Sequence, residues 1–169
     1  RYDGANLAKQ GIVVVTVNTR LNALGFLAHP DLTAEVGSSG NFALLDLIAA
    51  LQWVSTNIAE FGGDAASVTI AGESAGSMFV SLLMSSPLAK GLFHRAIGQS
   101  GAWFPSPERP MLDLAEAEQQ GLAFAKELGA KSAADLRALP LEAILDANPG
   151  LGFWPITDGH VIPPHPPQV

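Results

Sequence analysis

Ser-Val-Thr-Ile-Ala-Gly-Glu-Ser-Ala-Gly-Ser, residues 67–77, is the stretch that decides the fold of this chain. A short β-branched run leads directly into Gly72-Glu73-Ser74-Ala75-Gly76. A Gly-x-Ser-x-Gly pattern after a strand and before a helix is typical of a nucleophile elbow, a sharp turn that exposes a serine hydroxyl to a base and to amide donors. We expect Gly72 and Gly76, which lack a Cβ, to let the strand and the helix approach closely around a strained Ser74.

The residues after Ser74 predict a helix that begins at the serine and stops near Ser85-Ser86-Pro87. Its apolar face, at helical spacing, consists of Met78, Phe79, Leu82 and Leu83. The first amides of a helix carry partial positive charge, which suits an oxyanion that forms beside Ser74. We therefore expect the amide of Ala75 to donate to that oxyanion.

Strand-type and helix-type segments alternate along the first two thirds of the chain. Strands are predicted at Ile12–Val17, Val68–Ala71 and Arg95–Gln99, and a helix from Asn41 to about Asn57. Such alternation implies parallel strands joined by right-handed crossovers, which is an α/β architecture. Beyond Pro110 an Ala- and Leu-rich region predicts further helices.

Those helices are expected over 111–128, 132–139 and 141–147. Ser132 and Asp135 have the spacing of a capping box at the start of the second one. The proline-rich end, from Pro163 to Pro167, is expected to be extended.

Composition excludes several function classes. The 169 residues carry a formal net charge of -7 with only 9 Lys and Arg, so we expect no nucleic-acid partner. The apolar run Ile12–Val17 is too short to cross a bilayer, and we expect no membrane span. The absence of cysteine rules out a disulfide framework, and the compartment, cytoplasmic or secreted, stays open. The 4 histidines lack metal-ligand spacing, so neither a metal nor a cofactor is expected.

The chain resembles the type B carboxylesterases, which include cholinesterases and bacterial para-nitrobenzyl esterases, over nearly its whole length. The motifs that carry the resemblance, in order, are Tyr2-Asp3-Gly4, Val13 to Leu27, Gly40-Asn41 with Asp46, Ala50 to Val54, Asn57-Ile58-Ala59, Phe61 to Asp64, the elbow, Gly91-Leu92-Phe93, Arg95-Ala96-Ile97 and Gln99-Ser100-Gly101. The sequence departs from the family where Asn22 replaces a typical glycine. The two positions that match a frequent family disulfide are Ala130 and Asp135, so that bridge is absent.

The resemblance implies an α/β-hydrolase fold, of which residues 1–169 form part of one domain. Residues 1–109 would carry the core strands, helices and elbow, and residues 110–169 a helical, cap-like region with an extended tail. The three predicted strands would be the fourth to sixth of the family sheet. The third strand and the Gly-rich oxyanion loop would precede Arg1, so we expect the chain to be part of a longer protein.

The resemblance also implies that Ser74 attacks a carboxylic ester, while the acid and the histidine of the triad lie beyond this chain. Asp158 with His160 or His165 follows the serine in the right order, but these residues match a non-catalytic family segment and a proline-rich tail, and we do not assign them to the triad. His29 and His94 are expected to be surface residues.

Four further residues are candidates for the substrate pocket. Glu73 would organise buried water and polar contacts behind the site, or simply reflect a sequence preference. Ser100, in the near-repeat Gly98-Gln99-Ser100-Gly101-Ala102, would line the pocket. Trp103 and Phe104 fall where the family walls its acyl pocket, with core packing as the alternative.

The expected function is therefore serine-dependent hydrolysis of a small-molecule ester by the complete protein. The other partner implied is the rest of the same hydrolase domain. Two alternatives stay open: a catalytically inactive, cholinesterase-like interaction module, and a hydrolase of amides, thioesters or carbamates.

Overall fold

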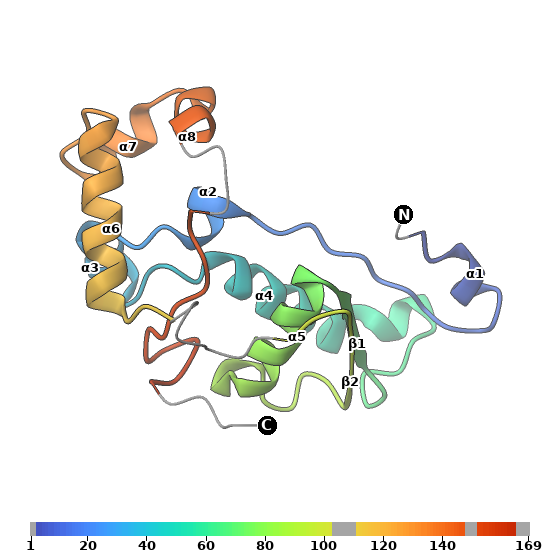
Figure 1. Cartoon of the computed structure of the whole chain (residues 1–169). Helices are drawn as coiled ribbons and strands as arrows, with labels where there is room; N and C mark the ends of the chain where they lie inside the picture. The colour runs from blue at the N-terminus through green and yellow to red at the C-terminus, as the bar shows by residue number, and fades with distance from the viewer. Residues whose placement is uncertain (1–2, 103–110, 148–151, 165–169) are drawn as a thin grey trace. The chain divides into compact units, whose positions relative to one another are not determined.

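The computed structural model of the chain describes residues 3–102, 111–147 and 152–164 (Figure 1). It forms two compact units: unit 1 comprises Arg1–Thr19, Asp46–Met84 and Leu88–Trp103, and unit 2 comprises Arg20–Leu45, Ser85–Pro87 and Phe104–Val169. The elements in chain order are α1 (Ala5–Ala8), α2 (Asn22–Phe26), α3 (Pro30–Val36), α4 (Phe42–Asn57), η1 (Ile58–Phe61), β1 (Thr69–Glu73), α5 (Ala75–Ser85), η2 (Pro87–Ala89), β2 (Arg95–Gln99), α6 (Leu114–Glu127), α7 (Ala133–Ala138) and α8 (Leu141–Ala147).

Unit 1 contains a two-stranded parallel sheet of β1 and β2, and helix α5 follows β1 in the chain. Strand β1 pairs with β2 so that Gly72 lies opposite Gly98 and Glu73 opposite Gln99 (Figure 1). The predicted bounds of β2 are confirmed, and β1 runs two residues further than expected, up to the elbow serine. Of the predicted apolar face of α5, Leu82 and Leu83 are buried while Met78 and Phe79 are half-buried.

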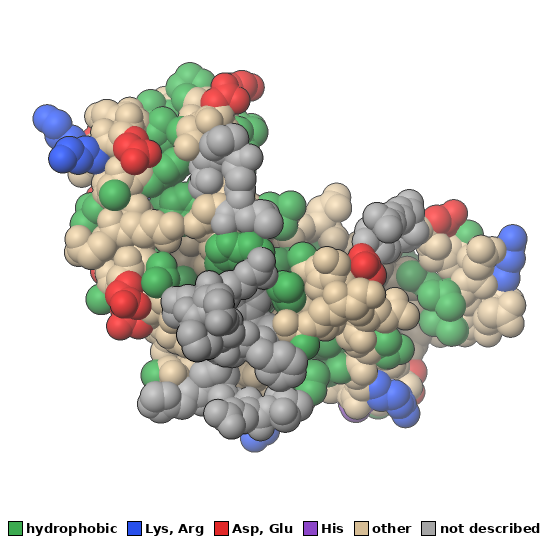
Figure 2. Space-filling view, viewed as in Figure 1, with side chains coloured by type: hydrophobic (Ala, Val, Ile, Leu, Met, Phe, Trp, Pro, Cys, Tyr) green, Lys and Arg blue, Asp and Glu red, His purple; other side chains and the backbone are tan. Residues whose placement is uncertain are grey.

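The strand predicted at Ile12–Val17 is wrong for the described part of the chain. These residues form no strand, and Ile12, Val13, Val15 and Val17 are 51%, 41%, 45% and 42% exposed. The apolar composition is that of a strand, but a strand also needs a neighbour to accept its backbone hydrogen bonds, and none of the described segments supplies one. Hydrophobic side chains consequently reach the surface among polar ones (Figure 2).

Helix α4 and the η1 turn that follows it form the longest apolar helical stretch of the chain's described part. Together they span Phe42–Phe61, 20 residues with a mean hydropathy of 1.4, which is long and apolar enough to cross a membrane by length and composition alone. Core helices of water-soluble proteins share this property. Three leucine and isoleucine side chains of α4 are buried: Leu44, Ile48 and Leu51.

Unit 2 is built mainly from helices that pack on the loop between α2 and α3. Ala28, Ala117 and Ile156 form one buried cluster, and Ala125, Ala130 and Leu136 form another. A Cβ placed on Gly121 of α6 would lie 1.8 Å from the carbonyl oxygen of Ala28, so the helix backbone rests directly on that loop.

A buried asparagine joins two distant segments of unit 2. Asn41, 2% exposed, donates its side-chain amide to the carbonyl of Ile156 at 2.9 Å and accepts from the amide of Ile156 at 3.1 Å. A side-chain amide can satisfy both backbone groups of one residue in this way because it carries a donor and an acceptor together. This pair of bonds holds the 152–164 segment in place within unit 2.

Asn22 stands where the resemblance leads us to expect a glycine, and the backbone there has the left-handed conformation that favours one. It begins α2 with a φ of 51°, in the left-handed region. Asparagine enters this region more readily than other residues with a Cβ.

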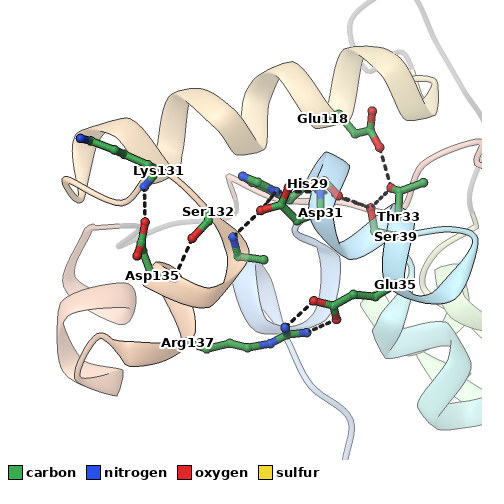
Figure 3. Close-up of polar contacts among 11 residues, drawn as sticks. His29, Asp31, Thr33, Glu35, Ser39, Glu118, Lys131, Ser132, Asp135 and Arg137 are labelled. Carbon is green, nitrogen blue, oxygen red and sulfur yellow. Dashed lines mark hydrogen bonds and ion pairs between the residues drawn. The ribbon is translucent and has the colours of Figure 1, made fainter.

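The expectation that His29 is a surface residue is wrong. Its side chain is 2% exposed, and its Nδ1 accepts a hydrogen bond from the amide of Asp31 at 3.2 Å, capping α3 before Pro30 (Figure 3). The amide of His29 donates to Ser39 Oγ at 3.1 Å. A histidine at an N-cap is uncommon, and the sequence around His29 does not distinguish it from a solvated loop histidine.

Polar contacts between α3 and the C-terminal helices also join parts of unit 2 that are far apart in the sequence. Arg137 donates two hydrogen bonds to the carboxylate of Glu35, at 2.7 and 2.6 Å (Figure 3). Asp31 accepts from the amide of Ala133 at 2.9 Å. Ser132 caps α7 as predicted, but the Asp135 carboxylate accepts from the amide of Lys131 at 2.9 Å.

Replacing Asn41 by alanine should lower the free energy of unfolding by about 1–3 kcal/mol, because the buried amide and carbonyl of Ile156 lose their partners. Urea denaturation of both proteins measures the difference. Asn57→Ala is the control, since its amide bonds to the Trp53 carbonyl within α4 in a more exposed place, and its effect should be about 0.5 kcal/mol. Equal losses in the two variants would contradict the assigned role of Asn41.

The hydrogen bonds from Arg137 hold the pKa of Glu35 below its ordinary value of 4.5. Because the pKa of Glu35 is lower in the folded state, the ion pair with Arg137 stabilises the fold above pH 4.5. This stabilisation is lost as the pH falls through the folded-state pKa of Glu35. We expect Arg137→Gln to return the Glu35 pKa to its ordinary value in an NMR titration of the carboxyl carbon. Lys126→Gln removes an equal charge elsewhere in unit 2 and should leave that pKa unchanged; the same change in both variants would refute the pairing.

Candidate active site

Ser74 occupies the sharp turn between β1 and α5, as the sequence predicts for a nucleophile elbow. Its φ of 54° lies in the left-handed region, and its side chain is exposed. A residue with a Cβ rarely adopts this conformation, and such residues gather at functional sites where the surrounding structure holds them. The turn therefore presents the hydroxyl outward at a local conformational cost.

Backbone hydrogen bonds hold both sides of this serine. Its amide donates to the carbonyl of Gln99 at the end of β2, at 2.9 Å. Its carbonyl accepts from the amide of Met78 at 3.1 Å, the first helical bond of α5. The left-handed residue is thus fixed by the sheet on one side and by the helix on the other.

The two elbow glycines have different roles. A Cβ on Gly72 would lie 2.2 Å from the carbonyl carbon and oxygen of Gly76, so no other residue fits there. A Cβ on Gly76 would meet nothing within 4 Å among the described residues. The prediction that both positions need glycine is therefore confirmed for Gly72 and wrong for Gly76. The peptide group of Gly76 faces Gly72 on the strand, whereas a side chain at position 76 would point away from the described residues.

Ala75 is the first residue of α5. Its amide is one of the first four of the helix, which have no acceptor within the helix and lie at its positive end. This position suits an oxyanion beside Ser74. The donor role of Ala75 stays a prediction.

Ser100 repeats the geometry of Ser74 one strand away. It follows Gln99, the partner of Glu73 in the sheet, and has a φ of 57°. A Cβ on the next residue, Gly101, would lie 2.9 Å from the carbonyl oxygen of Ser74. The near-repeat in the sequence therefore has a structural counterpart, and Ser100 directly follows β2, the strand paired with the one that ends before Ser74.

The remaining predicted pocket residues are placed less fully. Glu73 ends β1 and is half-buried. Trp103 and Phe104 lie outside the described residues. The pocket roles of all three, and of Ser100, stay predictions.

Asp158, which the sequence order alone would allow as a triad acid, has a structural role. Asp158 accepts hydrogen bonds from Ser38 Oγ at 2.7 Å and from the amides of His160, Val161 and Ile162, so it holds a turn of unit 2. His94 is exposed, as expected, and accepts from the amide of Val68 at 3.2 Å. The described residues contain no group of three His, Asp or Glu side chains that could hold a metal ion.

Ser77 was not predicted from the sequence. This residue of the first turn of α5 is 1% exposed, and its hydroxyl donates to the carbonyl of Gly101. The available signal was a hydroxyl three residues before Val80 on the buried side of the helix, where an apolar side chain is the rule.

Comparisons with known proteins agree on one family. The family model described as "Carboxylesterase family" matches residues 1–169. Fumonisin B1 esterase of Sphingopyxis macrogoltabida is 44% identical over 171 residues, which cover 95% of this chain, and carboxylesterase 5A of Felis catus is 42% identical over 172 residues, which cover 98%. The crystal structure of Geobacillus stearothermophilus carboxylesterase EST55 at pH 6.8 superimposes with a TM-score of 0.84 and 40% identity, over 98% of this chain.

These matches cover only part of the other proteins. The chain spans 31% of each of the two relatives and 36% of the EST55 chain. The α/β-hydrolase fold expected from the sequence is confirmed for the segment that the chain covers.

Gly72→Ala should disrupt the elbow, because its Cβ would collide with the Gly76 backbone, and we expect a loss of at least about 3 kcal/mol in the free energy of unfolding. Gly76→Ala places a methyl group in open space on a helix and should be neutral or stabilising by about 0.4–1 kcal/mol. Thermal and urea unfolding of the two variants provide the comparison. Similar destabilisation by both substitutions would refute the asymmetry.

Proposed function

Because this chain belongs to the carboxylesterase family, we propose that it carries the nucleophile of a serine carboxylic-ester hydrolase, with Ser74 as that nucleophile. The observation that carries the proposal is the left-handed Ser74 between β1 and α5, held on both sides by backbone hydrogen bonds. Such a turn has little value for packing, since it exposes the side chain, but it suits a group that must reach a substrate.

In this mechanism the oxygen of Ser74 forms a bond to the carbonyl carbon of the ester. A histidine takes the serine proton and then delivers it to the leaving alcohol as the acyl-enzyme forms. Water, activated by the same histidine, attacks the acyl-enzyme and releases the acid. We assign the histidine and the carboxylate that orients it to the part of the complete protein that lies outside this chain. The chain spans 31% of the length of the two curated relatives.

The negative charge that develops on the carbonyl oxygen lies beside the first turn of α5. The amide of Ala75 is the donor that this segment would provide, assisted by the positive end of the helix. Glycine amides from the rest of the protein would complete the oxyanion site.

The substrate would meet the carboxyl ends of β1 and β2, where both strands deliver a left-handed serine. Ser100 would face the substrate from the neighbouring strand, and Glu73 would support the site from the end of β1. Trp103 and Phe104, which follow directly in the sequence, would shape the acyl side. The ligand class is a small-molecule carboxylic ester.

Two other functions are separated from this one by experiment. An inactive interaction module would not react at Ser74. A hydrolase of amides, thioesters or carbamates would react at Ser74 but turn over those substrates faster than short acyl esters.

We expect a fluorophosphonate probe to label the complete protein stoichiometrically at Ser74, because the probe reacts with serines that a base activates. Intact mass and sequencing of the labelled peptide measure the extent and the position. Ser74→Ala should abolish the adduct, with a loss of ester turnover of about 10⁴-fold or more.

Ser100→Ala is the matched control, since Ser100 has the same backbone conformation one strand away. Its adduct should still form on Ser74. An adduct on Ser100, or no adduct on the intact wild-type protein, would overturn the proposal.

A further inference from the structure

The buried hydroxyl of Ser77 is a polar group of the elbow region that the proposed mechanism does not use. Ser77 is the third residue of α5 and is 1% exposed. Its Oγ donates a hydrogen bond to the carbonyl of Gly101, 24 residues further along the chain. This bond links the first turn of the nucleophile helix to the loop that follows β2.

Gly101 lies directly against the nucleophile. A Cβ on Gly101 would be 2.9 Å from the carbonyl oxygen of Ser74 and 3.5 Å from its Cα. The carbonyl that Ser77 binds therefore belongs to the residue in contact with the Ser74 backbone. The amide of Ser74 meanwhile donates to Gln99, two residues before Gly101, at 2.9 Å.

Gly98 makes room for the Ser77 hydroxyl. A Cβ on Gly98 would lie 2.6 Å from Ser77 Oγ, too close for any real contact, whereas the other atoms near it, Gly101 O and Ser77 Cβ, would lie at 3.8 Å. Among the described residues, the hydroxyl of Ser77 is the group that comes closer than 3 Å to this Cβ, so it explains the glycine at position 98.

We propose that Ser77 is a positioning residue for Ser74, tying the start of α5 to Gly101 so that the left-handed nucleophile turn is clamped between the helix and the end of β2. The proposal rests on the proposed function of Ser74. Ser77 touches no substrate in this scheme; it acts on the reaction through the backbone of Gly101 and Ser74. Losing its hydroxyl leaves a carbonyl without its donor beside the turn, so the angle at which Ser74 meets the ester becomes less well defined.

The test uses Ser77→Ala, Gly98→Ala and the double variant of the complete protein. For Ser77→Ala we expect kcat on a short acyl ester to fall about tenfold while KM changes less than about twofold, because ground-state binding is untouched. Gly98→Ala should have a similar effect, since its Cβ displaces the hydroxyl. The double variant should be no worse than Ser77→Ala alone, because the clash disappears with the oxygen.

Ser81→Ala is the matched control. Ser81 lies one turn further along α5, and its hydroxyl donates to the Ser77 carbonyl within the helix, at 3.1 Å. Its kcat should stay within about twofold of wild type. Should Ser77→Ala prevent folding, Ser77→Cys keeps a weak donor at the same place and should give a kcat between those of wild type and Gly98→Ala.

Hydrogen exchange of the peptides that cover residues 72–78 and 98–102 separates this proposal from the function on which it rests. Ser77→Ala should raise exchange about tenfold in both segments, whether or not the protein turns over esters. Unchanged exchange and kcat, or additive losses in the double variant, would overturn the positioning role. Faster exchange in a protein whose Ser74 takes no fluorophosphonate would support the clamp and refute only the esterase function.

Discussion

The contact between Gly72 and Gly76 is the constraint on which the described core of unit 1 depends. With 2.2 Å between the Gly76 carbonyl and a Cβ that Gly72 lacks, the end of β1 and the start of α5 touch backbone to backbone. A chain that leaves a strand and enters a helix within so small a distance must turn sharply, and one residue must take the left-handed conformation. That residue is Ser74, so the close approach determines which side chain is presented.

Strand β2 adds a second support for the Ser74 turn and places Ser100 beside it. Parallel pairing in register brings Gln99 opposite Glu73, and the Gln99 carbonyl receives the Ser74 amide. Because both strands end on a left-handed serine, the carboxyl edge of the sheet carries two hydroxyl-bearing turns side by side. Glycines at 98 and 101 allow this crowding, as Gly72 does on the other side. Unit 2, by contrast, is held by side chains that reach across the sequence, such as Asn41 to Ile156 and Arg137 to Glu35.

Local features were predictable from the sequence and features that depend on distant partners were not. Helices α4, α5 and α8, strand β2 and the elbow follow from short-range patterns, and the structure has them within a few residues of the expected bounds. The strand predicted at Ile12–Val17 was wrong because a strand forms only beside another strand that shares its backbone hydrogen bonds, and an apolar pattern does not show whether such a partner is present. The surface assignment of His29 was wrong because the pattern around it shows neither that its side chain is buried nor that its amide bonds to Ser39, ten residues further along the chain. Ser77 was missed because its partner, Gly101, lies 24 residues away.

The contacts that hold the left-handed backbone of Ser74 against its conformational strain are made by residues close to it in the structure. A strained backbone residue of this kind costs about 1–3 kcal/mol and persists only when its surroundings hold it. Here the contacts with Gln99, Met78 and Gly101 all lie between residues 72 and 101. The shape of the turn consequently depends on none of the residues proposed to supply the acid and the base. Geometry and reactivity are therefore separate properties of the proposed site: the sheet and α5 set the position of the Ser74 oxygen, whereas in the proposed mechanism a histidine outside this segment would set the rate.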